Sequence, residues 1–211
     1  MKQTIILNYT FFAILFFAST NGCRPDFKKT DDAPSNNDKY KEVLRSIKEI
    51  QERSELIEIT SSNKIRFDLR YATENNFMRV NLYGPFKKCY LHKIAADKLQ
   101  KAAELLSDTK EGYALLLSDC LRPRSVQRIL YETVRGTNQQ GFVGNPDKGS
   151  IHNFGFAVDL TIVNDKGQEI NMGTPFDSFE ELSRPDKESL FLSKGKIECC
   201  SARLCLMLAF R

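Results

Sequence analysis

One stretch of the 211-residue sequence leads from a loop into an apolar strand: Ser150-Ile151-His152-Asn153-Phe154-Gly155-Phe156-Ala157-Val158-Asp159. Because Gly155 allows the backbone to bend, His152 and Asp159 can converge when the chain returns along the strand. A neutral imidazole and a carboxylate suit zinc. A catalytic zinc usually takes three protein ligands, and the sequence has one other histidine. The spacing also fits a loop histidine and a strand aspartate that form only hydrogen bonds.

The segments around this stretch alternate between helical and strand patterns. Apolar residues recur at helical spacing in 92–106 and, after Pro123, up to Val134, where Gly136 ends the pattern. Strands are predicted at 65–71, 113–118 and 157–163, the last ending in a turn at 164–167. Residues 39–53 fit either a surface helix or a spacer. Since no regular βαβ repeat appears, we predict a small mixed α+β single domain with a central antiparallel-type sheet flanked by helices.

The composition is ordinary for a globular protein. Hydrophobic residues make up 41% and charged residues 27% of the chain. The net charge of +4 is spread along the sequence, without blocks of five or six like charges. We therefore expect neither a nucleic-acid partner nor a polybasic membrane surface.

The N-terminus has the pattern of an export signal. A hydrophobic run after Lys2 is shorter than the roughly 20 residues of a membrane span. Small or polar residues follow it and end in Gly22-Cys23. A lipoprotein signal with Cys23 as the lipidated residue, a plain secretory signal and a retained anchor all fit. The predicted organisation is a signal at 1–23, a flexible linker at 24–40 and a domain at 41–211. The mature protein is then exported, as a periplasmic or outer-envelope lipoprotein whose membrane contact is only the N-terminal lipid anchor.

Disulfides are permitted outside the cytoplasm. Setting Cys23 aside leaves an odd number of cysteines, which excludes a full disulfide framework: Cys89, Cys120, Cys199, Cys200 and Cys205.

Four segments, in order along about residues 65–180, resemble one family. Ser150–Asp159 is similar to the S-x-H-x-x-G-x-A-x-D motif of the zinc D-alanyl-D-alanine dipeptidases of the vancomycin-resistance type and of related D,D-carboxypeptidases. Arg70–Phe77 resembles the family's R-Y-A-T-x-x-N-F segment, Asp119–Pro123 its D-x-x-R-P turn, and Met172–Asp177 its M-G-x-x-F-D segment. The first and last of these three favour the dipeptidase branch.

The resemblance implies a role for each matching residue. His152 and Asp159 are implied as zinc ligands, and Arg122 as the group that stabilises the oxyanion formed when water attacks the amide. Arg122 also fits a helix-start arginine that pairs with Asp119.

The resemblance further implies three residues that bind the substrate. Ser150 is expected to hydrogen-bond the substrate near the metal, although it also fits a turn-forming residue after Gly149. Asp177 and Tyr71 are expected to hold the free ammonium end of the substrate.

The family's third zinc ligand and its general base come from a C-terminal E-x-x-H segment, typically E-W-W-H. This sequence has no tryptophan and no histidine after His152. His92, at the start of a predicted helix, is a poor substitute. Residues 202–211 loosely resemble the helix before the missing segment, which suggests a truncation or frameshift near Glu198.

The predicted function is zinc-dependent hydrolysis of the D-alanyl-D-alanine dipeptide, a cell-wall-related reaction, impaired in this chain by the missing ligand and base. Two alternatives are a non-catalytic binder of D-Ala peptides and a D,D-carboxypeptidase of the same superfamily.

Overall fold

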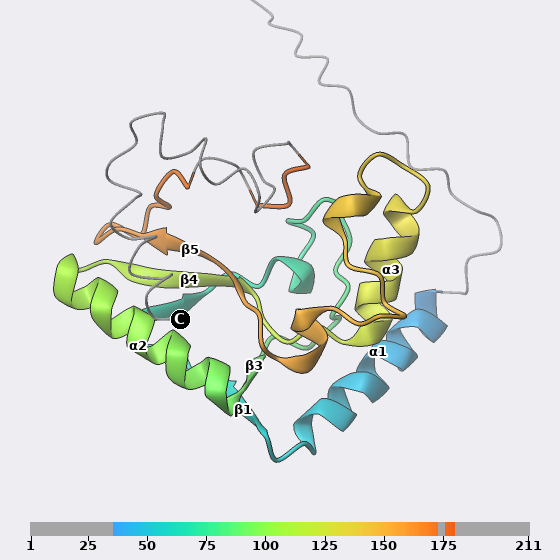
Figure 1. Ribbon diagram of the computed structural model, residues 1–211, viewed down its shortest axis with the longest axis horizontal. Helices are drawn as coiled ribbons and strands as arrows, with labels where there is room; N and C mark the ends of the chain where they lie inside the picture. Colours follow the sequence, from blue (N-terminus) through green and yellow to red (C-terminus); the bar gives the residue numbers. More distant parts are fainter. Residues whose placement is uncertain (1–35, 173–175, 180–211) are drawn as a thin grey trace, which may run out of the picture. The chain divides into compact units, whose positions relative to one another are not determined.

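A three-stranded sheet and a two-stranded sheet lie among three α-helices in residues 36–172 and 176–179, which the computed structural model describes (Figure 1). These residues belong to one structural unit, Pro34–Arg211. The predicted α+β class is confirmed.

The three-stranded sheet has the order β2-β4-β5, formed by β2 (Ile65–Phe67), β4 (Ala114–Asp119) and β5 (Asp159–Val163). The pair β4–β5 is antiparallel, as predicted, whereas β2 joins β4 in parallel. The central strand carries the apolar run expected of a strand buried on both faces, and Leu115 and Leu117 are fully buried. Strand β4 is therefore paired on both sides by β2 and β5, and it ends at the polar residue Asp119.

The two-stranded sheet pairs β1 (Leu56–Ile59) with β3 (Cys89–His92) in antiparallel register. Helix α2 (Lys93–Thr109) follows β3 directly, because His92 caps it: the His92 Nδ1 accepts a hydrogen bond from the Ile94 N–H at 3.3 Å. Helix α2 packs against β1, β3 and β4 with a small and apolar face. The face differs from the predicted periodicity in that Ile94 is exposed and Ala96 is buried. Its buried residues are Ala95, Ala96, Leu99, Ala102, Ala103 and Leu106.

Helices α1 (Asn36–Gln51) and α3 (Arg124–Val134) lie side by side (Figure 1), and the hydroxyl groups of Ser46 and Ser125 meet at 3.3 Å. Of the two interpretations of residues 39–53, the helix is correct, since its apolar positions are buried: Val43, Ile47 and Ile50. Helix α1 begins within the segment that the sequence predicts as linker, 24–40.

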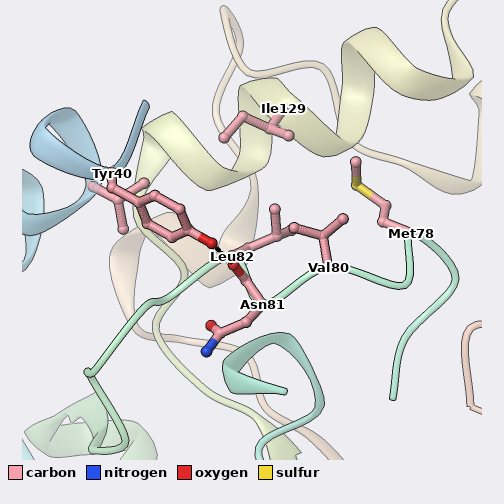
Figure 2. Close-up of a pocket in the computed structure, with 7 residues that line it drawn as sticks. Tyr40, Met78, Val80, Asn81, Leu82 and Ile129 are labelled. Atoms are coloured by element: carbon pink, nitrogen blue, oxygen red, sulfur yellow. Dashed lines mark hydrogen bonds between the residues drawn. The ribbon is translucent and has the colours of Figure 1, made fainter. Parts of the chain in front are cut away.

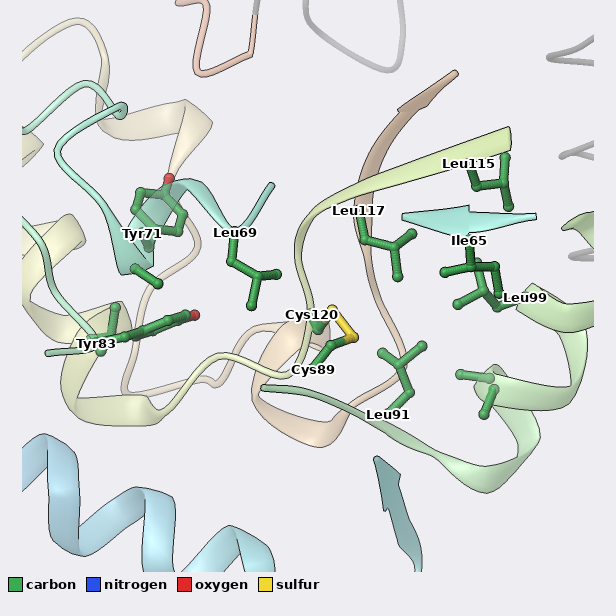
Figure 3. Packing of buried hydrophobic residues seen from close by; sticks show 14 of the residues in the cluster. Ile65, Leu69, Tyr71, Tyr83, Cys89, Leu91, Leu99, Leu115, Leu117 and Cys120 are labelled. Carbon is green, nitrogen blue, oxygen red and sulfur yellow. A yellow bond between two sulfur atoms is a disulfide. The ribbon is translucent and has the colours of Figure 1, made fainter. Parts of the chain in front are cut away.

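Three short 3₁₀ helices complete the described part: η1 (Arg70–Ala72), η2 (Gln140–Phe142) and η3 (Ile151–Phe154). The alternation that predicts a strand at 65–71 gives β2 and then η1, so Tyr71 leaves the sheet and packs in the core near Tyr83 (Figure 3). Within residues 36–172 and 176–179, no helix combines the length and hydropathy that crossing a bilayer requires. The predicted signal with Cys23, and the C-terminal segment 198–211, lie outside the described residues.

Candidate metal centre

Two strand ends bring two carboxylates together. Strand β4 ends at Asp119 and β5 begins at Asp159, and these residues are partners in the antiparallel register. The pairing is irregular between Leu117 and Asp119. The site is therefore built where the central strand leaves the sheet, next to the start of its antiparallel neighbour.

The segment before β5 is shaped by a cap and a glycine. The Ser150 side chain caps η3, with its Oγ accepting a hydrogen bond from the His152 N–H at 3.4 Å. Gly155 ends η3 at φ +73°, where a Cβ atom would lie 2.7 Å from the His92 backbone N, and its carbonyl accepts a hydrogen bond from that N–H at 2.9 Å. Only glycine fits there, so the backbone after His152 turns sharply and Asp159 returns beside it.

The His152 ring is held in one tautomer. Its Nδ1 lies 3.0 Å from the Cys120 carbonyl oxygen. Because a carbonyl oxygen can only accept, Nδ1 carries the proton and Nε2 keeps its lone pair in the neutral ring. Nε2 lies 3.4 Å from the Asp159 Oδ1. Metal-binding histidines commonly have this arrangement, in which the second ring nitrogen donates to a backbone carbonyl.

Arg122 connects the two carboxylates. Its guanidinium is buried and contacts the Asp119 Oδ2 at 2.7–2.8 Å and the Asp159 Oδ2 at 3.2 Å. A third partner is the fully buried Gln127, whose Oε1 accepts from Nη1 at 2.9 Å. The ring of Tyr71 lies 5.0 Å from the guanidinium carbon. The predicted pairing of Arg122 with Asp119 is observed, and the same side chain also reaches the predicted metal ligand Asp159.

Three residues place a potential ligand atom within 4.8 Å of one another: Asp119, His152 and Asp159. Asp119 is fully buried and already used, since its Oδ1 accepts from the Tyr83 hydroxyl at 2.7 Å and its Oδ2 from Arg122. Asp159 retains partial exposure. His152 Nε2 and Asp159 Oδ1 are therefore the candidate donor pair, and Asp119, which the sequence identified only as a partner of Arg122, contacts Arg122 and Tyr83 instead.

The charges at the site stabilise one another. Burial opposes the charged form of His152, but the adjacent Asp159 carboxylate raises the pKa of the His152 ring above its usual value. Burial acts against the charge of Asp159 as well, and here the neighbouring His152 and Arg122 prevail and lower the pKa of the Asp159 carboxyl. An imidazole and an ionised carboxylate at one point are groups that would hold a divalent cation, and binding would require the ring nitrogen to be free of its proton.

Asp177 and Tyr71, the predicted ammonium-binding residues, form a second group. The Tyr71 hydroxyl donates to the Asp177 Oδ1 at 2.8 Å, and the Phe77 N–H donates to Oδ2 at 3.2 Å. Burial raises the pKa of Asp177 to about 6 despite these hydrogen bonds. Tyr71 also packs on Arg122, so two side chains, Tyr71 and Arg122, connect the Asp177 carboxylate to Asp159.

Two further residues have structural contacts. Ser150 caps η3, and its predicted hydrogen bond to substrate stays a prediction. His92 caps α2 and stacks on Phe156 with ring centroids 4.3 Å apart. Of the three clustered residues, His152 and Asp159 remain as candidate donors, and within residues 36–172 and 176–179 the family's E-x-x-H segment has no counterpart.

A separate cavity of about 130 Å³ lies between α1, the segment 78–82 and α3 (Figure 2). Its lining offers no carboxylate, imidazole or thiol, and the Tyr40 hydroxyl is used in a hydrogen bond to the Asn81 carbonyl at 2.6 Å. The cavity therefore lacks the groups needed for metal or acid–base chemistry. Its lining residues are Tyr40, Val43, Met78, Val80, Asn81, Leu82 and Ile129.

Comparison with known proteins agrees with this geometry. Residues 55–191, more than half of the chain, match the family described as D-ala-D-ala dipeptidase. The chain is 29% identical over 119 residues to the D-alanyl-D-alanine dipeptidase of Escherichia coli (strain K12). That match covers 56% of this chain and 58% of the relative, so the chain spans less than two thirds of the relative's length.

Proposed function

Because this chain belongs to the D-ala-D-ala dipeptidase family, we propose that it is a metal-dependent dipeptidase whose substrate is the D-alanyl-D-alanine dipeptide. The observation that carries the proposal is the meeting of His152 Nε2, Asp159 Oδ1 and the Arg122 guanidinium at one strand end. The family and the similar dipeptidase support the reaction class, and the donor pair supports the dependence on a metal.

His152 and Asp159 are the residues that would hold the ion, which we propose to be zinc. One nitrogen and one oxygen donor fit zinc, and the Cys120 carbonyl fixes the required tautomer. A bound zinc ion supplies Lewis acidity toward the amide carbonyl and lowers the pKa of its water to about 7.

The remaining residues bind the substrate and stabilise developing charge. Arg122 is charged at every relevant pH, because the Asp119 carboxylate outweighs its burial and raises its pKa. Its fixed guanidinium can stabilise a negative oxygen on the attacked carbonyl. Asp177, hydrogen-bonded by the Tyr71 hydroxyl, provides a carboxylate that can pair with the ammonium group of a substrate. A short substrate with a free amino end fits both groups.

We also propose that turnover by this chain is slow. Its described residues supply two metal donors where catalytic zinc usually has three. They also supply no obvious general base, because Asp119 is bound by Arg122 and Tyr83. A second candidate function follows from the same observation: a chain that retains Arg122, Asp177 and Tyr71 can bind D-Ala peptides without cleaving them.

Export of the protein, with Cys23 as a lipid anchor, is likewise proposed. The described residues contain a disulfide between Cys89 and Cys120. Disulfides persist mainly in oxidising compartments, so this bond supports a location outside the cytoplasm, which the N-terminal sequence pattern also suggests.

One experiment separates the candidate functions. The full chain is incubated with zinc and D-alanyl-D-alanine, with L-alanyl-L-alanine as a control, and with a cell-wall stem pentapeptide ending in D-alanyl-D-alanine. Slow cleavage of the D-dipeptide alone, lost in His152→Ala, supports the dipeptidase. Binding of the dipeptide without cleavage supports the binder, and release of alanine from the pentapeptide supports the carboxypeptidase. If the chain neither cleaves nor binds any of these peptides, the proposal is refuted.

A further inference from the structure

The Cys89–Cys120 disulfide joins the two sheets at the metal centre. Cys89 lies in β3 of the two-stranded sheet, and Cys120 follows the last residue of β4 (Figure 3). Both cysteines are buried, at 1% and 3% exposure. The sequence left the pairing of its cysteines open, because proximity of β3 and the end of β4 depends on how the two sheets pack.

Cys120 lies where the sheet no longer restrains the chain. Strand β4 ends at Asp119, and its register with β5 is already irregular after Leu117. Beyond that point three hydrogen bonds hold the backbone: from the Leu121 N–H to the Tyr90 carbonyl at 3.0 Å, from the Arg122 N–H to the His152 carbonyl at 3.0 Å, and from the Asn153 side-chain amide to the Arg122 carbonyl at 2.8 Å. The disulfide adds a covalent connection to β3 at Cys120, which lies between the end of β4 and these two residues.

The carbonyl of Cys120 is also the group that orients His152. It accepts the hydrogen bond from Nδ1 at 3.0 Å, which leaves Nε2 directed at Asp159. Groups that hold a metal-binding histidine through its second nitrogen typically change metal affinity 10–100-fold when they are removed. A backbone carbonyl can perform this task only if its own position is fixed.

We propose that the Cys89–Cys120 disulfide is a positioning element of the metal centre: it fixes the Cys120 carbonyl, which in turn holds His152 in the tautomer and orientation that bind the ion. The inference rests on the proposed function of His152 as a metal ligand. Both cysteines are buried, so the bond lies within the folded site. A protein folded without it has a less well ordered donor pair.

The test compares the full chain with the double variant C89A/C120V, which removes the bond and keeps the buried site apolar. The control is Leu106→Ala, a cavity-forming change of a buried residue at the far end of α2. The first readout needs neither metal nor activity: ¹⁵N NMR of the imidazole nitrogens, recorded at an alkaline pH at which the His152 ring is neutral, reports the tautomer. The chain has two histidines, and His92 serves as the internal reference.

We expect the parent and the control to show His152 protonated at Nδ1, and C89A/C120V to show a mixture of tautomers. The second readout is cobalt affinity by competition with a chelator, where we expect a loss of about 10–100-fold in the double variant and little change in the control. An unchanged tautomer and affinity in a folded C89A/C120V would overturn the proposal. So would equal losses in Leu106→Ala.

If the double variant does not fold, Cys89→Ser, which retains Cys120, is measured in the same way and decides by the same criteria. Failure of the proposed function has a different signature: the parent chain itself would take up no cobalt, although its His152 tautomer could still be compared between variants. A tautomer that depends on the disulfide, in a chain that binds no metal, would refute the metal function and keep the structural connection.

Discussion

Replacing Asp119 by asparagine tests how much the buried ion pair between Asp119 and Arg122 stabilises the fold, because the change leaves the candidate metal donors His152 and Asp159 in place. Asp119 is fully buried and accepts hydrogen bonds from Arg122 and from the Tyr83 hydroxyl. Asparagine keeps the size and one acceptor oxygen but removes the charge. Arg122, which is itself buried, then retains only the Asp159 carboxylate at 3.2 Å as an anionic partner.

The magnitude follows from this loss. Removing one member of a buried ion pair costs about 3–5 kcal/mol, because the other charge stays buried without compensation. Since Asp159 and Gln127 still contact Arg122, we expect the lower end, about 3 kcal/mol. For a domain of this size that corresponds to a fall in Tm of about 6–12 °C. Arg122 should also bind Asp159 more closely and compete with the metal for it.

Urea denaturation and thermal melting measure the loss, and Asp147→Asn is the matched control. Asp147 pairs with Arg128 at 2.9 Å, but the two side chains are 72% and 54% exposed. An exposed pair contributes about 0–1 kcal/mol, so Asp147→Asn should be close to neutral. Equal small effects of the two variants would refute the account of a buried charge network around Arg122.

Two further predictions concern the turn before β5 and the second carboxylate. Gly155→Ala should destabilise the fold by more than about 1–2 kcal/mol, the cost of the left-handed conformation alone, because its Cβ atom also meets the His92 N at 2.7 Å; Gly141→Ala, with open space around it, should change the urea midpoint little, and equal shifts would contradict the assigned turn. Burial raises the pKa of Asp177 to about 6. The contribution of Asp177 to the stability of the fold is therefore fully present below its ordinary pKa of 3.8 and is lost as the pH rises through about 6. Asp177→Asn should therefore gain in Tm relative to the parent between pH 4 and pH 7, and a difference in Tm that stays constant with pH would argue against this.

The elements with strong local patterns could be predicted from the sequence. The alternating or periodic apolar positions of α2, α3, β4 and β5 predict structures that the fold confirms. Strands β1 and β3 were not predicted, since four residues that pair with a distant segment carry little periodic signal. The alternation up to Tyr71 predicted a longer strand, but β2 ends at Phe67 and the chain turns into η1.

In the candidate site, too, the residues within local motifs could be predicted, whereas those that act through contacts between distant segments could not. The motif around Gly155 identified His152 and Asp159, and the D-x-x-R-P turn identified Arg122. The function of Asp119 as the common acceptor of Arg122 and Tyr83 depends on contacts between segments 36 residues apart. Gln127 gave no signal either, because a buried glutamine in a helix is recognised only by what it contacts, here Arg122 and the Gly144 carbonyl.

Equilibrium zinc binding to the full chain measures whether His152 and Asp159 share one divalent cation. We expect one ion per parent chain at this site, and loss of that ion in His152→Ala and in Asp159→Ala, while His92→Ala keeps it. Equal zinc uptake by the parent and both ligand variants, or no uptake by the folded parent, would contradict it.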